Sequence, residues 1–279
     1  NYDEFRAAKD QPPRQDSAGS NNWAVAGNLT SHGGALVAND MHLGHLLPNI
    51  WYRARMSWPE GDHTRSLVGV TLPGLPMLVS GSNGQVAWGF TNSYGDWADL
   101  VILELDPENP RRYLTPDGFQ AITSTAEIIE VFDSTADTLW VEETIWGPVW
   151  TKDTKGNRLV LHWTAYDSET VYGGLRTMET VRNVDEVVAK SGTIGMPQQN
   201  LVCGDDQGRI AWTIAGFIPR RVGWDGRLPV SWADGTHRWQ GYYESHLQPH
   251  IVDPPEGRLW TANSRVSAGK HLDMIGDGG

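Results

Sequence analysis

The chain has 279 residues, of which 39% are hydrophobic and 20% charged, so it can bury a core as one large or two small domains and does not belong to the disordered class. Its 34 acidic residues outnumber its 22 basic ones, and the formal net charge of −12 excludes nucleic acid and anionic membranes as main partners, because both select basic surfaces. No apolar run approaches the roughly 18 residues that a membrane-spanning helix needs.

The first 19 residues are hydrophilic and contain two consecutive prolines. This composition predicts that residues 1–19 form a linker or processing segment ahead of the folded part. From residue 20 onward the pattern is rich in strands. Short apolar runs at residues 23–27 and 35–40 flank the turn-forming stretch 28–34, which predicts a hairpin.

A second hairpin is predicted within residues 77–90, where Asn83-Gly84 lies between two apolar runs. Further strands are expected at residues 126–132, 138–144, 158–164 and 209–215. A helical pattern is confined mainly to residues 167–193, where Asn183 followed three residues later by Glu186 resembles a capping box. Together these elements predict an α+β domain with a large share of antiparallel sheet, spanning residues 20–279 without a further boundary.

Most signatures of hydrolases and metal sites are absent from the sequence, which has no G-x-S-x-G motif, no Walker loop and no H-E-x-x-H motif. His42 and His45 have the spacing of two metal ligands on a helix, but a third ligand does not follow nearby. The single cysteine, Cys203, allows no internal disulfide. It is interpreted as a small buried residue, because no neighbouring feature would activate its thiol.

The stretch "AGSNNWAVAG" at residues 18–27 leaves two interpretations of Ser20 open. Gly, Ser and Asn are common turn residues, so Ser20 could belong to an ordinary turn. Alternatively, a cut between Gly19 and Ser20 would give the serine its own base, because the freed α-amino group has an ordinary pKa of about 7.7–8.0. A hydroxyl beside such a base is an activated nucleophile.

Five segments, in order, resemble the catalytic chain of the penicillin acylase family of N-terminal-nucleophile hydrolases. "GSNNWAV" is similar to the family's processing site, and "NDMHLG" at residues 39–44 is similar to its "NDPHL" segment. The remaining three segments are "LPGLPMLVSGSNGQVAWGFTNSYGDWADL" at 72–100, "GDDQGRIAWTIAGFIPRR" at 204–221 and "TANSR" at 261–265.

The resemblance implies catalytic roles for four residues. Ser20 would be the nucleophile, and the backbone N–H of Asn92 and the side-chain amide of Asn263 would bind the oxyanion of the tetrahedral intermediate. His42 would tune or orient the α-amine, as in the branch that contains cephalosporin, lactone-type quorum-signal and lipopeptide acylases. The family's second asparagine in the last motif is Ser264 here. Without the resemblance, Asn92 is a turn residue, Asn263 a cap and His42 a structural histidine.

The resemblance also implies a structural calcium ion and part of an acyl pocket. Carboxylates and backbone carbonyls are the ligands that Ca²⁺ prefers, although a solvated acidic turn is the competing interpretation of "GDWADL". The implied calcium ligands are Asp96, Ala98, Asp99, Pro219 and Asp277. Leu43 and Phe90 match positions that line the acyl pocket in relatives, and core packing explains both equally well.

The fold implied by the resemblance is a four-layer αββα sandwich of the N-terminal-nucleophile hydrolases, of which this chain would be a truncated catalytic segment. The implied activity is hydrolysis of an acyl amide after autoproteolysis at Gly19-Ser20, in a periplasmic or secreted enzyme. The partners would be a small acyl-amide substrate and the smaller N-terminal (alpha) chain of the same precursor. A catalytic arginine would follow Gly279. The alternative from another class is a secreted β-rich binding or structural domain without catalysis.

Overall fold

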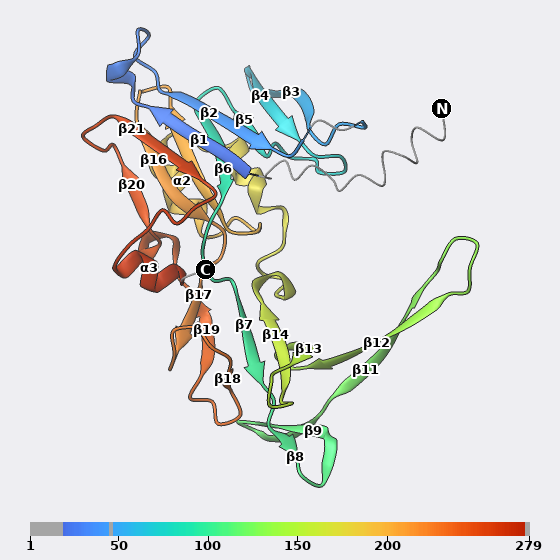
Figure 1. The fold of residues 1–279 in the computed structure, drawn as a ribbon. Coiled ribbons are helices and arrows are strands. Elements are labelled where there is room, and N and C mark those ends of the chain that lie inside the picture. The colour runs from blue at the N-terminus through green and yellow to red at the C-terminus, as the bar shows by residue number, and fades with distance from the viewer. Residues whose placement is uncertain (1–18, 45–46, 277–279) are drawn as a thin grey trace.

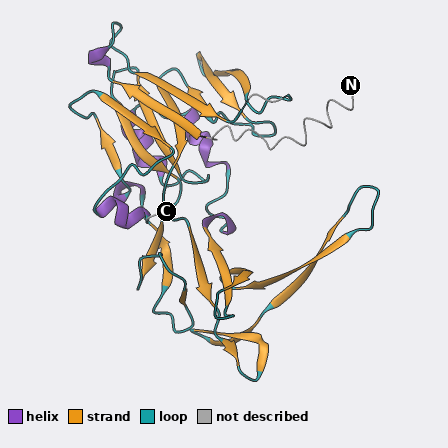
Figure 2. Cartoon of the chain, viewed as in Figure 1, coloured by secondary structure: helices purple, strands orange, loops and turns teal. Residues whose placement is uncertain are grey.

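The computed structural model describes residues 19–44 and 47–276, and strands dominate this part of the chain (Figures 1 and 2). The helical segments are short. They are α2 (Val184–Ser191), α3 (Lys270–Ile275) and four 3-10 turns, η1 (Gly27–Leu29), η2 (Thr164–Tyr166), η3 (Gly173–Glu179) and η4 (Ser245–Leu247).

Two antiparallel sheets form the upper part of the molecule in Figure 1. The three-stranded sheet has the order β2 (Leu36–His42), β1 (Gly19–Val25), β21 (Arg258–Ala262), so β1 has a partner strand on each edge. The seven-stranded sheet has the order β20 (His250–Val252), β16 (Ile210–Ala215), β15 (Gln199–Asp205), β6 (Val86–Asn92), β5 (Ser80–Ser82), β4 (His63–Thr71), β3 (Tyr52–Glu60).

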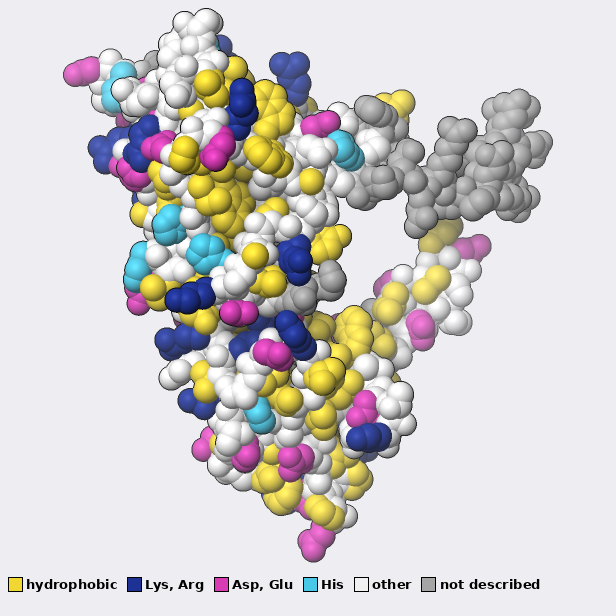
Figure 3. Space-filling model, turned by 60° about the vertical axis from the view of Figure 1, so that its left-hand side comes forward, with side chains coloured by type: hydrophobic (Ala, Val, Ile, Leu, Met, Phe, Trp, Pro, Cys, Tyr) yellow, Lys and Arg dark blue, Asp and Glu magenta, His cyan; other side chains and the backbone are white. Residues whose placement is uncertain are grey.

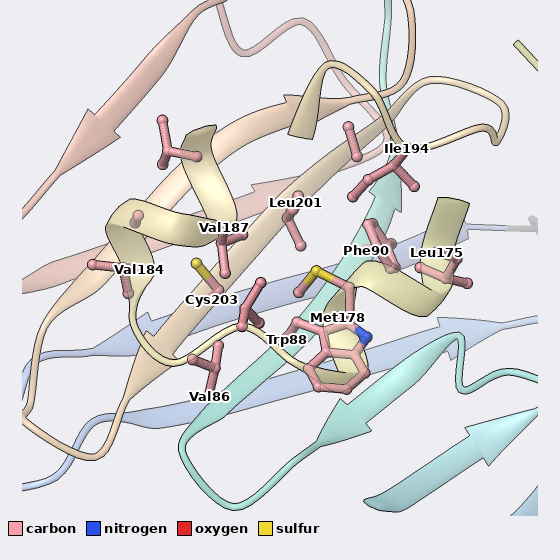
Figure 4. Close-up of a cluster of buried hydrophobic side chains, with 14 of the residues drawn as sticks. Val86, Trp88, Phe90, Leu175, Met178, Val184, Val187, Ile194, Leu201 and Cys203 are labelled. Carbon is pink, nitrogen blue, oxygen red and sulfur yellow. The ribbon is translucent and has the colours of Figure 1, made fainter. Parts of the chain in front are cut away.

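Alternation along the central strands separates two hydrophobic clusters, one on each face of the seven-stranded sheet. Val202 and Trp212 pack toward the three-stranded sheet, against Ala24 and Leu259. Leu201 and its neighbours on the other face pack against α2 and η3, which Figure 4 shows lying over that face. Three of the four predicted layers are therefore visible in the described part of the chain: two sheets and one layer of helix.

The second hairpin and the helix cap follow from local chemistry as predicted. The turn between β5 and β6 contains Asn83, whose side chain accepts hydrogen bonds from two backbone N–H groups, and Gly84 with a φ of 91°. Helix α2 begins after Asn183, whose side chain accepts a hydrogen bond from the Glu186 N–H at 2.9 Å. The Glu186 carboxylate accepts from the backbone N–H of Arg182 at 3.0 Å.

The lower part of the molecule is built on a six-stranded sheet, shown below the two upper sheets in Figure 1. Its order is β11 (Thr123–Ile129), β12 (Asp137–Thr144), β13 (Gly147–Lys152), β14 (Arg158–Trp163), β7 (Ala98–Ile102), β18 (Val230–Ser231). All neighbours are antiparallel except β7 and β18, which pair in parallel. Strands β11 and β12 form a hairpin arm that projects away from the rest.

Two small sheets complete the lower part. They are β10 (Gly118–Ala121), β9 (Asn109–Thr115), β8 (Leu105–Asp106) and the pair β17 (Pro219–Val222), β19 (Arg238–Tyr242). A third hydrophobic cluster with Val101, Val160 and Trp232 lies between these elements. Strand β6 continues through residues 93–97 into β7, so the end of β6 joins the two parts of the molecule.

On the face shown in Figure 3, Lys and Arg side chains lie beside acidic ones. Within residues 19–44 and 47–276, no helix has both the length and the apolar character that crossing a bilayer would require.

Candidate active site

Ser20 is the second residue of β1 and is half-buried, with its side chain on the face that looks toward the seven-stranded sheet. Its Oγ donates a hydrogen bond to Asn263 Oδ1 at 2.7 Å. This contact follows from the strand register, because Asn21 pairs with Ala262, the last residue of β21, and Asn263 comes next. Two residues 243 positions apart in sequence are thereby brought into direct contact.

Asn92 lies at the exposed end of β6, next to the end of β21. The hydroxyl of Thr91 donates to Thr261 Oγ1 at 2.9 Å and approaches the carbonyl oxygen of Ala262 at 3.4 Å. The residues that follow these two pairs are Asn92 and Asn263. β21 therefore connects Asn92 with Ser20, because its last residues contact Thr91 and the next residue, Asn263, contacts Ser20.

The Asn39 side chain on β2 binds the backbone of β6 along one edge of that strand. Its Nδ2 donates to the Phe90 carbonyl at 2.8 Å, and its Oδ1 accepts from the Phe90 N–H at 3.3 Å. Backbone groups two residues apart in a strand leave it on the same edge. The Asn92 N–H is therefore directed to the edge on which β2 contacts Phe90.

His42 lies on β2 opposite Gly19, the residue before Ser20. Its side chain is 43% exposed and its Nε2 is 3.1 Å from Asp40 Oδ2. Since Ser20 pairs with Met41, alternation directs the His42 side chain to the other face of the three-stranded sheet from the Ser20 hydroxyl. The structure thus brings His42 beside the Gly19-Ser20 backbone but not beside the Ser20 side chain. His45, which shares a helix-like spacing with His42 in the sequence, lies outside the described residues.

The two predicted pocket residues lie apart from each other. Leu43 follows β2 and is 42% exposed. The Phe90 side chain is 5% exposed and packs in the cluster between the seven-stranded sheet and the helices, with Leu175 and Met178 (Figure 4). The structure therefore gives the Phe90 side chain a core contact, while the Phe90 backbone bonds to Asn39 on β2.

Three of the predicted calcium ligands, Asp96, Ala98 and Asp99, lie where β7 begins, and an arginine that the sequence did not single out bonds to two of them. Arg221 Nε donates to Asp99 Oδ2 at 2.9 Å, while its Nη2 is 3.2 Å from Asp96 Oδ2 and donates to the Asp96 carbonyl at 2.9 Å. Ala98 is the first residue of β7 and Pro219 the first of β17. Asp277 lies outside the described residues.

Burial makes this acidic cluster electrostatically unusual. It raises the pKa of Asp96 to about 6 and also raises the pKa of Asp99, against the opposing effect of the Arg221 guanidinium. One guanidinium faces two carboxylates, and the buried Asp99 Oδ1 has no hydrogen-bond partner among the described residues. An orphaned carboxylate oxygen fits a further cation. The cluster is also joined to α3, because the Asp96 N–H donates to the Ile275 carbonyl at 2.7 Å.

Apart from the candidate site, the described residues contain the single cysteine and a groove lined by aromatic side chains. Cys203 is fully buried, and burial raises the pKa of its thiol, which confirms its interpretation as a core residue. Within the described ranges, no group of three or more His, Cys, Asp and Glu side chains is arranged to bind a metal. A groove of about 1080 Å³ lies between the root of the arm and β19, lined by aromatic side chains such as Trp146, Trp163 and Trp239, and it includes none of the predicted site residues.

The family model described as penicillin amidase matches residues 2–277. The sequence is 30% identical over 260 residues to penicillin acylase 2 proenzyme of Pseudomonas sp. (strain SE83), covering 92% of this chain and 33% of that protein. It is 29% identical over 263 residues to the acyl-homoserine lactone acylase QuiP of Pseudomonas aeruginosa, covering 89% of this chain and 30% of that protein. The chain therefore spans about a third of the length of these relatives.

The fold matches the solved structure of a thermostable penicillin G acylase from Alcaligenes faecalis with a TM-score of 0.75 at 22% identity, over 90% of this chain and 45% of that one. This match confirms the predicted α+β class with antiparallel sheets and the fold of the N-terminal-nucleophile hydrolases.

Proposed function

The chain belongs to the penicillin amidase family, and from this premise we propose that it is the catalytic segment of an acylase that hydrolyses the amide bond between an acyl group and an amine. The names of the relatives define the substrate classes to be tested. One is named a penicillin acylase and another an acyl-homoserine lactone acylase, so both kinds of linear acyl amide are candidates.

The observation that carries this proposal is the 2.7 Å hydrogen bond between Ser20 Oγ and the amide of Asn263, beside the strand end that contains Asn92. In the proposed reaction, Ser20 Oγ attacks the amide carbonyl carbon and forms a C–O bond. The negative charge on the substrate oxygen is stabilised by the Asn92 N–H and by Asn263 Nδ2, and such donors change kcat by about 10²–10³ each.

We propose that Ser20 gains its base when the Gly19-Ser20 bond is hydrolysed. The α-amine of Ser20 then takes the hydroxyl proton and delivers it to the leaving amine as the C–N bond breaks. Water attacks the acyl-enzyme next, gives its proton to the same α-amine, and releases the carboxylic acid as the proton returns to Ser20 Oγ. A smaller N-terminal chain would be the other product of processing, and the word proenzyme in the name of one relative supports this.

A calcium ion is proposed as a structural component at the junction of the two parts of the molecule. Asp96 and Asp99 would bind it through carboxylates, and Ala98 and Pro219 through carbonyl oxygens. When bound, the ion neutralises the carboxylate charge that Arg221 leaves uncompensated. It takes part in no step of the reaction.

The proposed function is tested in the full-length protein with Ser20→Ala. Intact-mass analysis of the unmutated protein should show a break between Gly19 and Ser20, and the purified protein should release amine from a panel of acyl amides of increasing chain length. Ser20→Ala should abolish both the break and the release. The matched control is Ser82→Ala, which alters the serine of "SGSNG" in the β5–β6 hairpin and should leave both intact. Hydrolysis that persists in Ser20→Ala would refute the assignment.

A further inference from the structure

A buried polar network connects the two proposed oxyanion donors. It begins at Trp212 on β16, whose Nε1 donates to Asn200 Oδ1 at 3.1 Å. Asn200 on β15 is fully buried, and its Nδ2 lies 3.1 Å from Thr91 Oγ1 and 3.3 Å from the carbonyl oxygen of Asn92. All the polar atoms of the Asn200 side chain therefore have partners, and two of those partners flank the Asn92 N–H along the chain.

The network continues from β6 into the other sheet. The Thr91 hydroxyl accepts from Asn200 and donates toward Thr261 on β21, at 2.9 Å. Thr91 and Thr261 are 1% and 5% exposed, so these bonds form in a region that water does not reach. Thr261 is two residues before Asn263, which contacts Ser20.

The two oxyanion donors come from different sheets. The distance between them therefore depends on how the two sheets are held against each other. A tetrahedral oxyanion needs both donors at about 2.7–3.1 Å. A displacement of about 1 Å can lower the rate roughly 100-fold. Hydrophobic contacts between the sheets are non-directional and tolerate sliding, whereas hydrogen bonds between Asn200, Thr91 and Thr261 fix both distance and direction.

We propose that Asn200 is a positioning residue, which sets the separation of the Asn92 N–H from the Asn263 amide by holding Thr91 and the Asn92 carbonyl together. This inference rests on the proposed acylase function and adds to it a residue that does not touch the substrate. An asparagine is suited to the position because one side chain supplies the acceptor for Trp212 and the donors for β6. Aspartate would lack the donors, and leucine would supply neither.

The test uses Asn200→Leu and Thr91→Val, each of which removes network bonds at nearly constant volume, made in the full-length protein and assayed on the processed form. We expect kcat to fall about 100-fold, with KM changed by no more than about threefold. Affinity for an alkylboronic acid, which forms a tetrahedral adduct with a serine hydroxyl, should fall by a similar factor. Inhibition by the carboxylic acid product, which is planar, should stay unchanged.

Two control variants remove buried hydrogen bonds elsewhere in the seven-stranded sheet. Asn83→Leu breaks bonds to the Met178 and Val181 carbonyls, at the other end of β6, and Thr213→Val breaks a bond to the Pro249 carbonyl. Both should lower stability while keeping kcat. If Asn200→Leu does not fold, Thr91→Val decides the question.

The proposal is overturned if the network variants keep kcat, if the controls lose as much kcat as they do, or if boronic acid and product affinities fall together. An unmutated protein that hydrolyses none of the amides would refute the acylase function itself, and with it this inference. Activity of the unmutated protein therefore distinguishes failure of the positioning role from failure of the acylase function.

Discussion

Substitution of Gly89 by alanine should separate the two sheets directly beneath the candidate site. Gly89 lies on β6 in the layer between the sheets, and a Cβ added there would be 2.6 Å from Asn39 Cβ and 2.9 Å from Asn22 Oδ1. Carbon atoms pack at about 3.5 Å or more, so β2 must move by about 0.9 Å, the difference between 3.5 and 2.6 Å. Asn39 Cβ is attached directly to the backbone of β2, so a side-chain rotation cannot relieve this contact.

Overpacking of this size in a core costs about 1–3 kcal/mol of the free energy of unfolding. The strain also reaches catalysis, because Asn39 binds the Phe90 N–H and carbonyl, two residues before the proposed donor of Asn92. We therefore expect Gly89→Ala to lower kcat by at least about tenfold in addition to its effect on stability.

The assay is urea unfolding of the full-length protein together with steady-state kinetics on an acyl amide. The matched control is Gly173→Ala, where the nearest atom to the new Cβ is Met77 Sδ at 4.0 Å, so its free energy of unfolding should change by no more than about 0.5 kcal/mol. A Gly89→Ala protein with unchanged unfolding and unchanged kcat would show that the close approach of the sheets does not position the site.

Three further predictions concern the junction, the surface and the core. Calcium at about 100 times its Kd should stabilise the protein by about 2.7 kcal/mol, measured as a higher melting temperature that chelation reverses. Asp99→Asn should remove this response. An unmutated protein whose melting temperature does not respond to calcium would argue against the metal site. Arg209 binds Asp185 and lowers its pKa, so the stabilisation from this pair is complete above the ordinary pKa of 3.8 and disappears as pH falls through the lowered value. Arg209→Met should therefore reduce the free energy of unfolding by no more than about 1 kcal/mol at pH 7 and by less at pH 3; equal losses at both pH values would contradict this account. Cys203 should react with a thiol reagent only after urea unfolds the protein, since burial raises the pKa of its thiol, and rapid labelling of the native protein would refute its placement in the core.

The sequence predicted the elements that short-range chemistry determines. The Asn83-Gly84 pair indicated a hairpin, and the structure has the β5–β6 turn there. The Asn183 cap predicted where α2 begins. By contrast, α3 was missed, because its six residues follow Gly269, which offers no side-chain cap, and carry too few turns for a periodic signal. The parallel pairing of β7 and β18 likewise has no local signal.

The candidate site could be predicted only as a set of residues, not as an arrangement. The motifs named Ser20 and Asn263, but their contact depends on the register of β1 and β21. His42 shows the limit most clearly, since the face that a strand residue occupies changes with a register shift of one. Arg221 bonds to Asp99 from 122 positions away, and Asn200 bonds to Thr91 from 109 positions away, so their partners could be identified only from the tertiary structure.

The central position of β1 in its sheet would govern how a cut chain behaves at Ser20. Most new termini fray, because the end of a chain regains conformational freedom when its neighbour is removed. Ser20 is paired with Met41 on one edge, while its side chain is bound by Asn263 on the other. A terminus created at this point would stay ordered. The α-amine and the hydroxyl of Ser20 would then be held in place without a further loss of conformational entropy. In the proposed mechanism, cleavage alone would therefore supply the base that the hydroxyl needs.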